Sequence, residues 1–198
     1  MIVKNVKNIL KTNLGDYETS IETPKEGAFQ RAIILHKFSV IDGEIIEWLD
    51  IELPVVPPDD RRNSRRPSLD LIGHSDSGYV ICELKFGNNS DNPSATATQI
   101  KDYQNYIQLN CDKLDENNVH HKNGKHFCWK DVARTARLII AANEQYWLKH
   151  RGAKLPEDIN CYSLNVKNDW FVEQKKNRGC GPYTPSLPED CCWTLVKQ

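Results

Sequence analysis

Three charged residues stand where a buried hairpin would ordinarily carry apolar side chains. The stretch from Asp70 to Lys85 reads D-L-I-G-H-S-D-S-G-Y-V-I-C-E-L-K. Its two apolar runs, Leu69 to His74 and Tyr79 to Phe86, are rich in β-branched, aromatic and aliphatic residues, which favours strands. The S-D-S-G segment between them is typical of a turn. We therefore expect a hairpin with an aspartate on one strand and a Glu-x-Lys on the other.

The spacing predicts where the charges meet. Side chains alternate between the two faces of a strand, so Glu83 and Lys85 share one face. If Ser75 pairs with Gly78, Asp70 stands opposite Glu83, with Cβ atoms roughly 5 Å apart. A bulge at Gly78 would shift the register by one residue and move Asp70 to the other face. We favour the first register because it brings the two carboxylates together.

Two carboxylates this close repel each other unless a cation offsets the repulsion. Mg²⁺ prefers oxygen ligands and is usually held by one or two carboxylates together with water and substrate phosphate. Lys85 lies on the same face as Glu83 and would direct its ammonium group to the same place. The three residues therefore indicate a metal-dependent site that acts on phosphate.

Asp70 followed by Glu83-Leu84-Lys85 resembles the core motif of the PD-(D/E)XK nuclease superfamily. Pro67 stands three residues before Asp70, whereas the proline of that family usually stands directly before the aspartate. The resemblance covers roughly residues 20–145 and implies an α/β, restriction-endonuclease-like fold. That fold has an αβββαβ core in which a central mixed sheet is flanked by helices.

A second motif extends the resemblance. Gln99 and Tyr103 resemble the Q-x-x-x-Y signature of the RecB-like and phage-exonuclease branches, and residues four apart lie on one face of a helix. A helix is expected here on independent grounds, because Asn92 can cap it and Pro93 suits its first position. Ile100 and Ile107 continue an apolar stripe along it.

The resemblance implies a single nuclease-like domain over residues 1–198, with a C-terminal elaboration after residue 145, that cleaves DNA using Mg²⁺ or Mn²⁺. Asp70, Glu83 and the main-chain carbonyl of Leu84 would hold the metal, and Lys85 would orient or deprotonate the attacking water. Gln99 would position Lys85 or the phosphate, and Tyr103 would contact the DNA backbone. Two alternatives stay open: an inactive nucleic-acid-binding or interaction module on the same fold, and an unrelated α/β binding protein.

The first helix of the family often carries a glutamate at the site. Thr23-Pro24-Lys25-Glu26 reads as a capping box that opens a helix through Ile33. Glu26 is therefore the natural candidate, with Glu22 as the alternative. The capping box by itself also explains Glu26, and we favour that structural interpretation.

Four arginines lie immediately before the strand that carries the aspartate: Arg61, Arg62, Arg65 and Arg66. Guanidinium groups match phosphate geometry, so this loop could contact the nucleic-acid backbone at the mouth of the site. A solvated loop paired with Asp59 and Asp60 is an equally good interpretation of the residues. Proximity to the site favours phosphate contact slightly.

Composition agrees with a compact enzyme. The chain has 198 residues and a net charge of −1, so polyanion binding must come from local clusters. No apolar run approaches the ~20 residues of a membrane span. Met1 to Leu14 reads as an amphipathic helix without a secretory pattern, so we expect a cytoplasmic protein with no membrane partner. The sequence indicates nothing about oligomeric state.

Seven cysteines are present. Some nucleases of this branch hold an iron–sulfur cluster with one cysteine before the core, but no cysteine precedes Cys82, so a cluster is not expected. We expect Cys82 in the core and the thiols reduced. The group of His120, His121, His126 and Cys128 fits no zinc spacing well and favours a loop.

The remaining sequence predicts scaffold. Residues 137–143 (R-L-I-I-A-A-N) are typical of a buried central strand. A short helix is expected over 144–151, with further strands over 161–166 and 193–196. Asp42-Gly43 favours a hairpin, although a longer first helix would compete with it.

Overall fold

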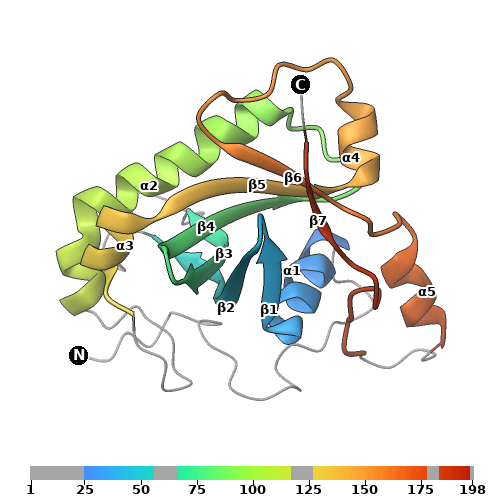
Figure 1. Cartoon of the computed structure of the whole chain (residues 1–198), viewed down its shortest axis with the longest axis horizontal. Helices are drawn as coiled ribbons and strands as arrows, with labels where there is room; N and C mark the ends of the chain where they lie inside the picture. Colours follow the sequence, from blue (N-terminus) through green and yellow to red (C-terminus); the bar gives the residue numbers. More distant parts are fainter. Residues whose placement is uncertain (1–24, 56–66, 117–126, 178–182, 197–198) are drawn as a thin grey trace.

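The computed structural model describes residues 25–55, 67–116, 127–177 and 183–196. Five helices and seven strands lie in these ranges (Figure 1). The elements are, in chain order, α1 (Lys25–His36), β1 (Phe38–Ile41), β2 (Glu44–Pro54), β3 (Ser68–Ser75), β4 (Gly78–Lys85), α2 (Pro93–Glu116), α3 (Trp129–Thr135), β5 (Arg137–Asn143), α4 (Glu144–Lys149), β6 (Asn160–Leu164), α5 (Trp170–Asn177) and β7 (Trp193–Leu195).

All seven strands form one mixed sheet in the order β1-β2-β3-β4-β5-β6-β7. Strands β1 to β4 each pair antiparallel with the next strand in the chain. Strands β4, β5 and β6 are parallel neighbours, and the α2–α3 segment supplies the long crossover that a parallel pair needs. The mixed α/β class expected from the sequence is confirmed.

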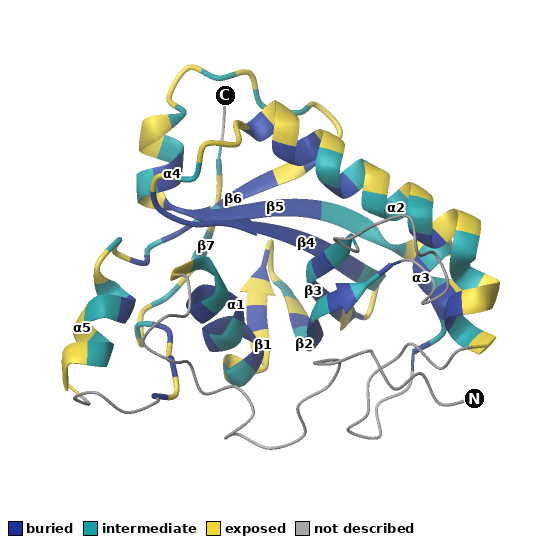
Figure 2. Cartoon of the chain, turned by 180° about the vertical axis from the view of Figure 1, so that it is seen from behind, coloured by how far each residue is buried: buried dark blue, intermediate teal, exposed yellow. Residues whose placement is uncertain are grey.

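Helices cover both faces of the sheet and produce two apolar cores. On one face Phe29 and Ile33 of α1 and Phe171 of α5 pack with Leu71, Leu84 and other buried residues. On the other face Ile100 and Ile107 of α2 pack with Trp129 of α3 and with Ile72, Ile81 and Ile140 of the sheet. Figure 2 shows the central strands largely buried between these layers, with exposed positions recurring along α2.

The sheet is strongly curved. Its terminal strands β1 and β7 contact each other although they stand at opposite ends of the strand order. Trp193 of β7 stacks on Trp48 of β2, with ring centroids 5.6 Å apart. The two indoles therefore close the concave side of the sheet over the core that α1 occupies.

Local sequence explains the element boundaries that matter for the site. Asp42 and Gly43 have φ of 53° and 82°, the left-handed values that a tight hairpin turn requires, so the hairpin prevails over a longer first helix. Asn92 caps α2, since its Oδ1 accepts a hydrogen bond from Ala95 N at 2.9 Å. Pro93 begins that helix, as the sequence predicts.

The later elements also match the sequence closely. The predicted central strand over 137–143 is β5, and the predicted helix after it is α4, which ends at Lys149. The two predicted C-terminal strands are β6 and β7, and β7 is a sheet edge. The expected N-terminal helix over 1–14 lies outside the described residues. Within the part of the chain that the structure describes, no helix has the length and apolar character needed to cross a membrane.

Strand β2 buries a carboxyl group away from the hairpin of β3 and β4. Asp50 is 1% exposed, follows a shift in the β2–β3 register, and accepts one hydrogen bond, from Ile51 N at 2.8 Å. Its Oδ2 has no hydrogen-bond partner in the structure described. Burial, aided by the charge of Glu52 and opposed by the Ile51 N–H, raises the pKa of Asp50 from 3.8 to about 8.

The raised pKa makes Asp50 a source of pH-dependent instability. The folded state keeps a proton that the unfolded chain releases, so the free energy of unfolding falls as pH rises between about 4 and about 8, by at most ~1.4 kcal/mol per pH unit. Asp50→Asn keeps the acceptor for Ile51 and removes the titration. Its gain in stability over the parent, measured by urea unfolding at about pH 5 and about pH 8, should grow with pH. Asp76→Asn, in the exposed β3–β4 turn, is the matched control, and equal growth in both variants would contradict the assignment.

Candidate active site

The β3–β4 hairpin has the register that the sequence predicts. Ser75 pairs with Gly78, and the pairing continues without a shift to Leu71 and Cys82. The paired residues of β3 and β4 end there, one position before Asp70 and Glu83. The predicted register is therefore confirmed, but the two carboxylates do not form the directly opposed ladder pair that it implied.

The regular alternation of side chains along β3 is interrupted at Asp70. Leu69 and Leu71 are two residues apart, yet they pack into the cores on opposite faces of the sheet. In β2, Glu52 stands between the pairs Ile51–Leu71 and Leu53–Leu69 and has φ = 51°, a strained backbone for a residue other than glycine. Asp70 thus lies at an irregularity that involves both neighbouring strands.

Beyond the end of the β3–β4 ladder, the Asp70 side chain accepts the hydrogen bonds that the main chain no longer makes. Its Oδ2 accepts a hydrogen bond from Leu84 N at 2.8 Å, and its Oδ1 accepts one from Gln30 Nε2 at 2.7 Å. Leu84 N would otherwise need an acceptor within the sheet, because a buried N–H without one is costly. The two bonds hold the carboxylate beside β4.

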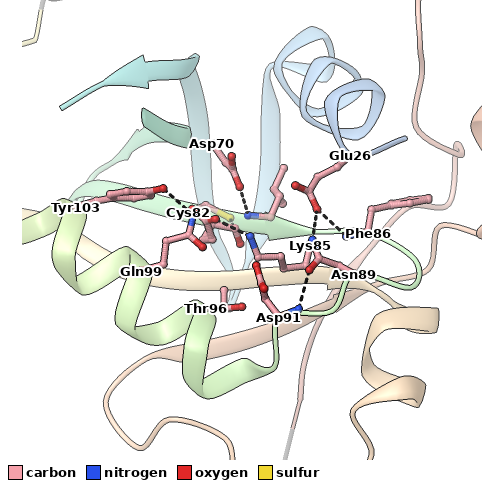
Figure 3. A network of polar contacts seen from close by, with 12 residues as sticks. Glu26, Asp70, Cys82, Lys85, Phe86, Asn89, Asp91, Thr96, Gln99 and Tyr103 are labelled. Carbon is pink, nitrogen blue, oxygen red and sulfur yellow. Dashed lines mark hydrogen bonds and ion pairs between the residues drawn. The ribbon is translucent and has the colours of Figure 1, made fainter. Parts of the chain in front are cut away.

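Glu83 and Lys85 share the face of β4 that looks toward α2. Lys85 Nζ donates to Glu83 Oε1 at 2.7 Å, and the two residues are only 4% and 1% exposed, Lys85 and Glu83 respectively. Glu83 Oε2 is buried and has no hydrogen-bond partner among the described residues. Figure 3 shows Asp70 and Lys85 beside β4, in the space between α1 and α2.

The buried carboxyls perturb each other. Burial and the neighbouring charge of Glu83 raise the pKa of Asp70 well above its usual range, against the opposing effects of Lys85 and of the Leu84 N–H. Burial also raises the pKa of Glu83, although the charge of Lys85 and the hydrogen bond from Lys85 lower it. The charge of one acid therefore affects the proton affinity of the other.

Lys85 keeps its proton in this arrangement. Burial alone would lower its pKa, but the charges of Glu83 and Asp70 outweigh burial and raise the pKa above that of a free lysine. Lys85 is therefore a fixed positive charge and a hydrogen-bond donor in the structure described.

Helix α2 contributes the two residues of the predicted Q-x-x-x-Y pair. Gln99 Nε2 donates to the hydroxyl oxygen of Tyr103 at 2.6 Å, which confirms that both side chains lie on one helix face. Burial raises the pKa of Tyr103, the Gln99 hydrogen bond lowers it, and the charges of Glu83 and Asp70 raise it further. The pair thus lies within electrostatic range of the carboxylates, as Figure 3 also shows.

Helix α1 directs Glu26 toward the end of β4. Glu26 Oε2 accepts hydrogen bonds from Phe86 N at 3.2 Å and from Asn89 Nδ2 at 3.1 Å (Figure 3). Its charge also acts on Asp70, Glu83 and Lys85. The observed role of Glu26 is to anchor the segment after β4. Glu22, Thr23 and Pro24 lie outside the described residues, so the structure does not test the capping box or the alternative at Glu22.

The donor set suits a hard divalent cation. Glu83 Oε2 is an unpartnered buried oxygen next to a second carboxylate, and a cation would relieve both the repulsion and the missing contact. Within the described ranges, no group of three or more His, Cys, Asp and Glu side chains is arranged as a metal cage. A metal here would rely on Asp70, Glu83 and main-chain oxygen, which leaves positions for water and phosphate.

Several predicted candidates fall outside the site or outside the described residues. Arg61, Arg62, Arg65 and Arg66 all lie in the range 56–66, and the three histidines of the 120–126 segment lie in 117–126, so the structure tests neither group. The Cys128 thiol, directly before α3, donates a hydrogen bond to the Asp115 carboxylate of α2. Cys82 is a buried core residue, as predicted, and packs in the core on the α1 side of the sheet.

Sequence reasoning missed two contributors, Gln30 and Asn89. Gln30 follows Glu26 by four residues, so the two share one face of α1. The sequence did contain one indication of this role, because Gln30 is a polar residue next to Phe29 and Ile33 on the apolar side of the predicted helix. Asn89 links Glu26 to α4, because its carbonyl accepts hydrogen bonds from Lys149 Nζ at 3.0 Å and lies 3.2 Å from His150 Nε2. No local pattern indicated that role.

Metal affinity at this site should rise with pH. Because burial raises the pKa of both carboxyls, and the charge of Glu83 raises that of Asp70 further, a cation must displace a proton to bind between them. Calorimetric titration with Mn²⁺ should give weaker binding at about pH 5.5 than at about pH 7.5. Repeating it in buffers of different ionisation enthalpy should show proton release, and equal affinity without proton release would contradict this electrostatic picture.

No family model, curated protein or solved structure significantly matches the chain. The geometry of the site is therefore the basis for its functional interpretation.

Proposed function

We propose that the protein is a metal-dependent phosphodiesterase that cleaves DNA. The observation that carries the proposal is the buried, unpartnered Glu83 Oε2 beside the Asp70 carboxylate, with the Lys85 ammonium 2.7 Å from the other Glu83 oxygen. Two carboxylates and a lysine in a low-dielectric site suit a reaction in which negative charge develops on phosphate.

The fold order supports the resemblance to PD-(D/E)XK nucleases. Strands β2, β3 and β4 follow α1, then α2 and α3 lead to the parallel strand β5. This matches an αβββαβ order in which β1 adds one edge strand and α3 adds a short helix. We propose that this part of the chain is a restriction-endonuclease-like core, and that α4 to β7 extend its sheet.

In the proposed site, Asp70, Glu83 and the main-chain carbonyl of Leu84 would hold Mg²⁺ or Mn²⁺. When bound, the metal would polarise the scissile phosphate and lower the pKa of an attacking water. Asp70 is held ready by its bonds to Leu84 N and Gln30, so little reorganisation is needed on binding. Glu83 would exchange part of its contact with Lys85 for the cation.

Lys85 would act as a charged donor. Its raised pKa means that it carries a proton while the carboxylates are ionised, so it can orient a water molecule and stabilise charge on a phosphate oxygen. Proton abstraction by Lys85 would require the metal to reduce the negative field of Asp70 and Glu83 first. The charge-stabilising role is the one that the observed electrostatics favour.

Gln99 and Tyr103 would face the substrate from α2. The Gln99 amide fixes the Tyr103 hydroxyl at 2.6 Å, and that hydroxyl can reach a backbone phosphate as a neutral donor because its pKa is raised. Their contribution is to position the DNA strand, with Arg61, Arg62, Arg65 and Arg66 as proposed phosphate contacts at the mouth.

Cleavage assays test the proposal directly. The purified chain should cut duplex or single-stranded DNA with Mg²⁺ or Mn²⁺, and EDTA should stop the reaction. Lys85→Met should lower the rate by roughly 10²- to 10⁴-fold, the usual worth of a positioned proton-transfer or charge-stabilising group. Circular dichroism and thermal melting would establish that each variant folds.

Metal binding separates the roles of the site residues. Asp70→Asn should lose both cleavage and Mn²⁺ binding, whereas Lys85→Met should still bind Mn²⁺, because both carboxylates remain and a competing cation is gone. A parent protein that binds metal but leaves DNA and RNA uncut would favour the inactive binding module. A Lys85→Met variant as active as the parent would disprove the role given to this lysine.

A further inference from the structure

Helix α1 carries a polar side chain on its buried face. Gln30 is 5% exposed. Its neighbours on the helix, Phe29, Ile33 and Ile34, are all buried in the core. An amide buried in an apolar setting without a hydrogen-bond partner destabilises the fold. A glutamine at this position therefore needs a specific contact that accounts for it.

That contact is the candidate metal ligand. Gln30 Nε2 donates to Asp70 Oδ1 at 2.7 Å, while Leu84 N donates to Asp70 Oδ2 at 2.8 Å. The two donors come from different elements, α1 and β4, and grip the carboxylate from both oxygens. Without the Gln30 amide, only the Leu84 N–H would orient the Asp70 side chain toward Glu83.

We propose that Gln30 is a positioning residue that fixes the Asp70 carboxylate for metal binding; this inference rests on the proposed function. A carboxylate oxygen has two lone pairs, so one accepted hydrogen bond leaves a lone pair for a cation. Partners of this kind commonly orient metal ligands, and their loss typically costs 10- to 100-fold in metal affinity.

The chemistry of glutamine suits this role better than that of a charged donor. A lysine or arginine in the same place would add a second ammonium-type charge beside Lys85 and repel the cation. The neutral amide supplies a donor without that charge. Glu26, one turn earlier on the same helix face, bonds to Phe86 N and Asn89, so α1 holds the two ends of the site from one rigid element.

The test measures Mn²⁺ affinity by calorimetry on the full chain. Gln30→Met has similar length and apolar volume but no donor, and it should weaken Mn²⁺ binding 10- to 100-fold. Gln30→His can place its Nε2–H at nearly the same reach and should retain most of the affinity. If Gln30→Met does not fold, Gln30→Asn withdraws the amide by one methylene and should weaken binding likewise.

Ser39→Ala is the matched control. It removes the acceptor of another buried side-chain hydrogen bond, from Trp48 Nε1 at 2.8 Å, between β1 and β2. It should lower stability without changing Mn²⁺ affinity. Equal affinity in the parent and Gln30→Met, or an equal loss in Ser39→Ala, would overturn the positioning role alone. A parent that binds no Mn²⁺ would overturn the proposed function, and this inference with it.

Discussion

The hydrogen bond from Leu84 N to Asp70 Oδ2 is the contact on which the site depends. It lies where β3 leaves the ladder with β4, and it lets a side-chain carboxylate replace the main-chain acceptor that the sheet no longer offers. The strained backbone of Glu52 and the packing of Leu69 and Leu71 on opposite faces belong to the same irregularity. A ladder that continued regularly past Leu71 and Cys82 would not have needed the Asp70 carboxylate as the acceptor for Leu84 N.

Three charged side chains meet at this irregularity, and each changes the pKa of the others. Two buried acids and one lysine leave a net negative site, and the acids respond by raising their pKa values. Removing one partner of a buried ion pair typically costs about 3–5 kcal/mol, so the Glu83–Lys85 contact cannot be lost without compensation. A divalent cation is the simplest compensation, because it binds both carboxylates without requiring the sheet to move.

The helices on both faces of the sheet contribute to the same site from opposite directions. Helix α1 supplies Glu26 and Gln30, and α2 supplies Gln99 and Tyr103. Each pair is spaced by four residues, so each presents two polar groups on an otherwise apolar packing face. The apolar neighbours, such as Phe29 and Ile100, anchor the helices, and this rigid packing sets the positions of the polar groups.

Local sequence determined much of this protein. The turn at Ser75 to Gly78, the hairpin at Asp42-Gly43, the cap at Asn92 and the apolar run of β5 follow from short-range chemistry, and Glu83 and Lys85 share a face because strands alternate. Tertiary structure decided the rest. The ladder between β3 and β4 ends before Asp70, next to the strained Glu52 of β2, and the contact from Gln30 joins residues 40 positions apart. Such contacts arise only when helix and sheet pack together, so no local pattern could have predicted them.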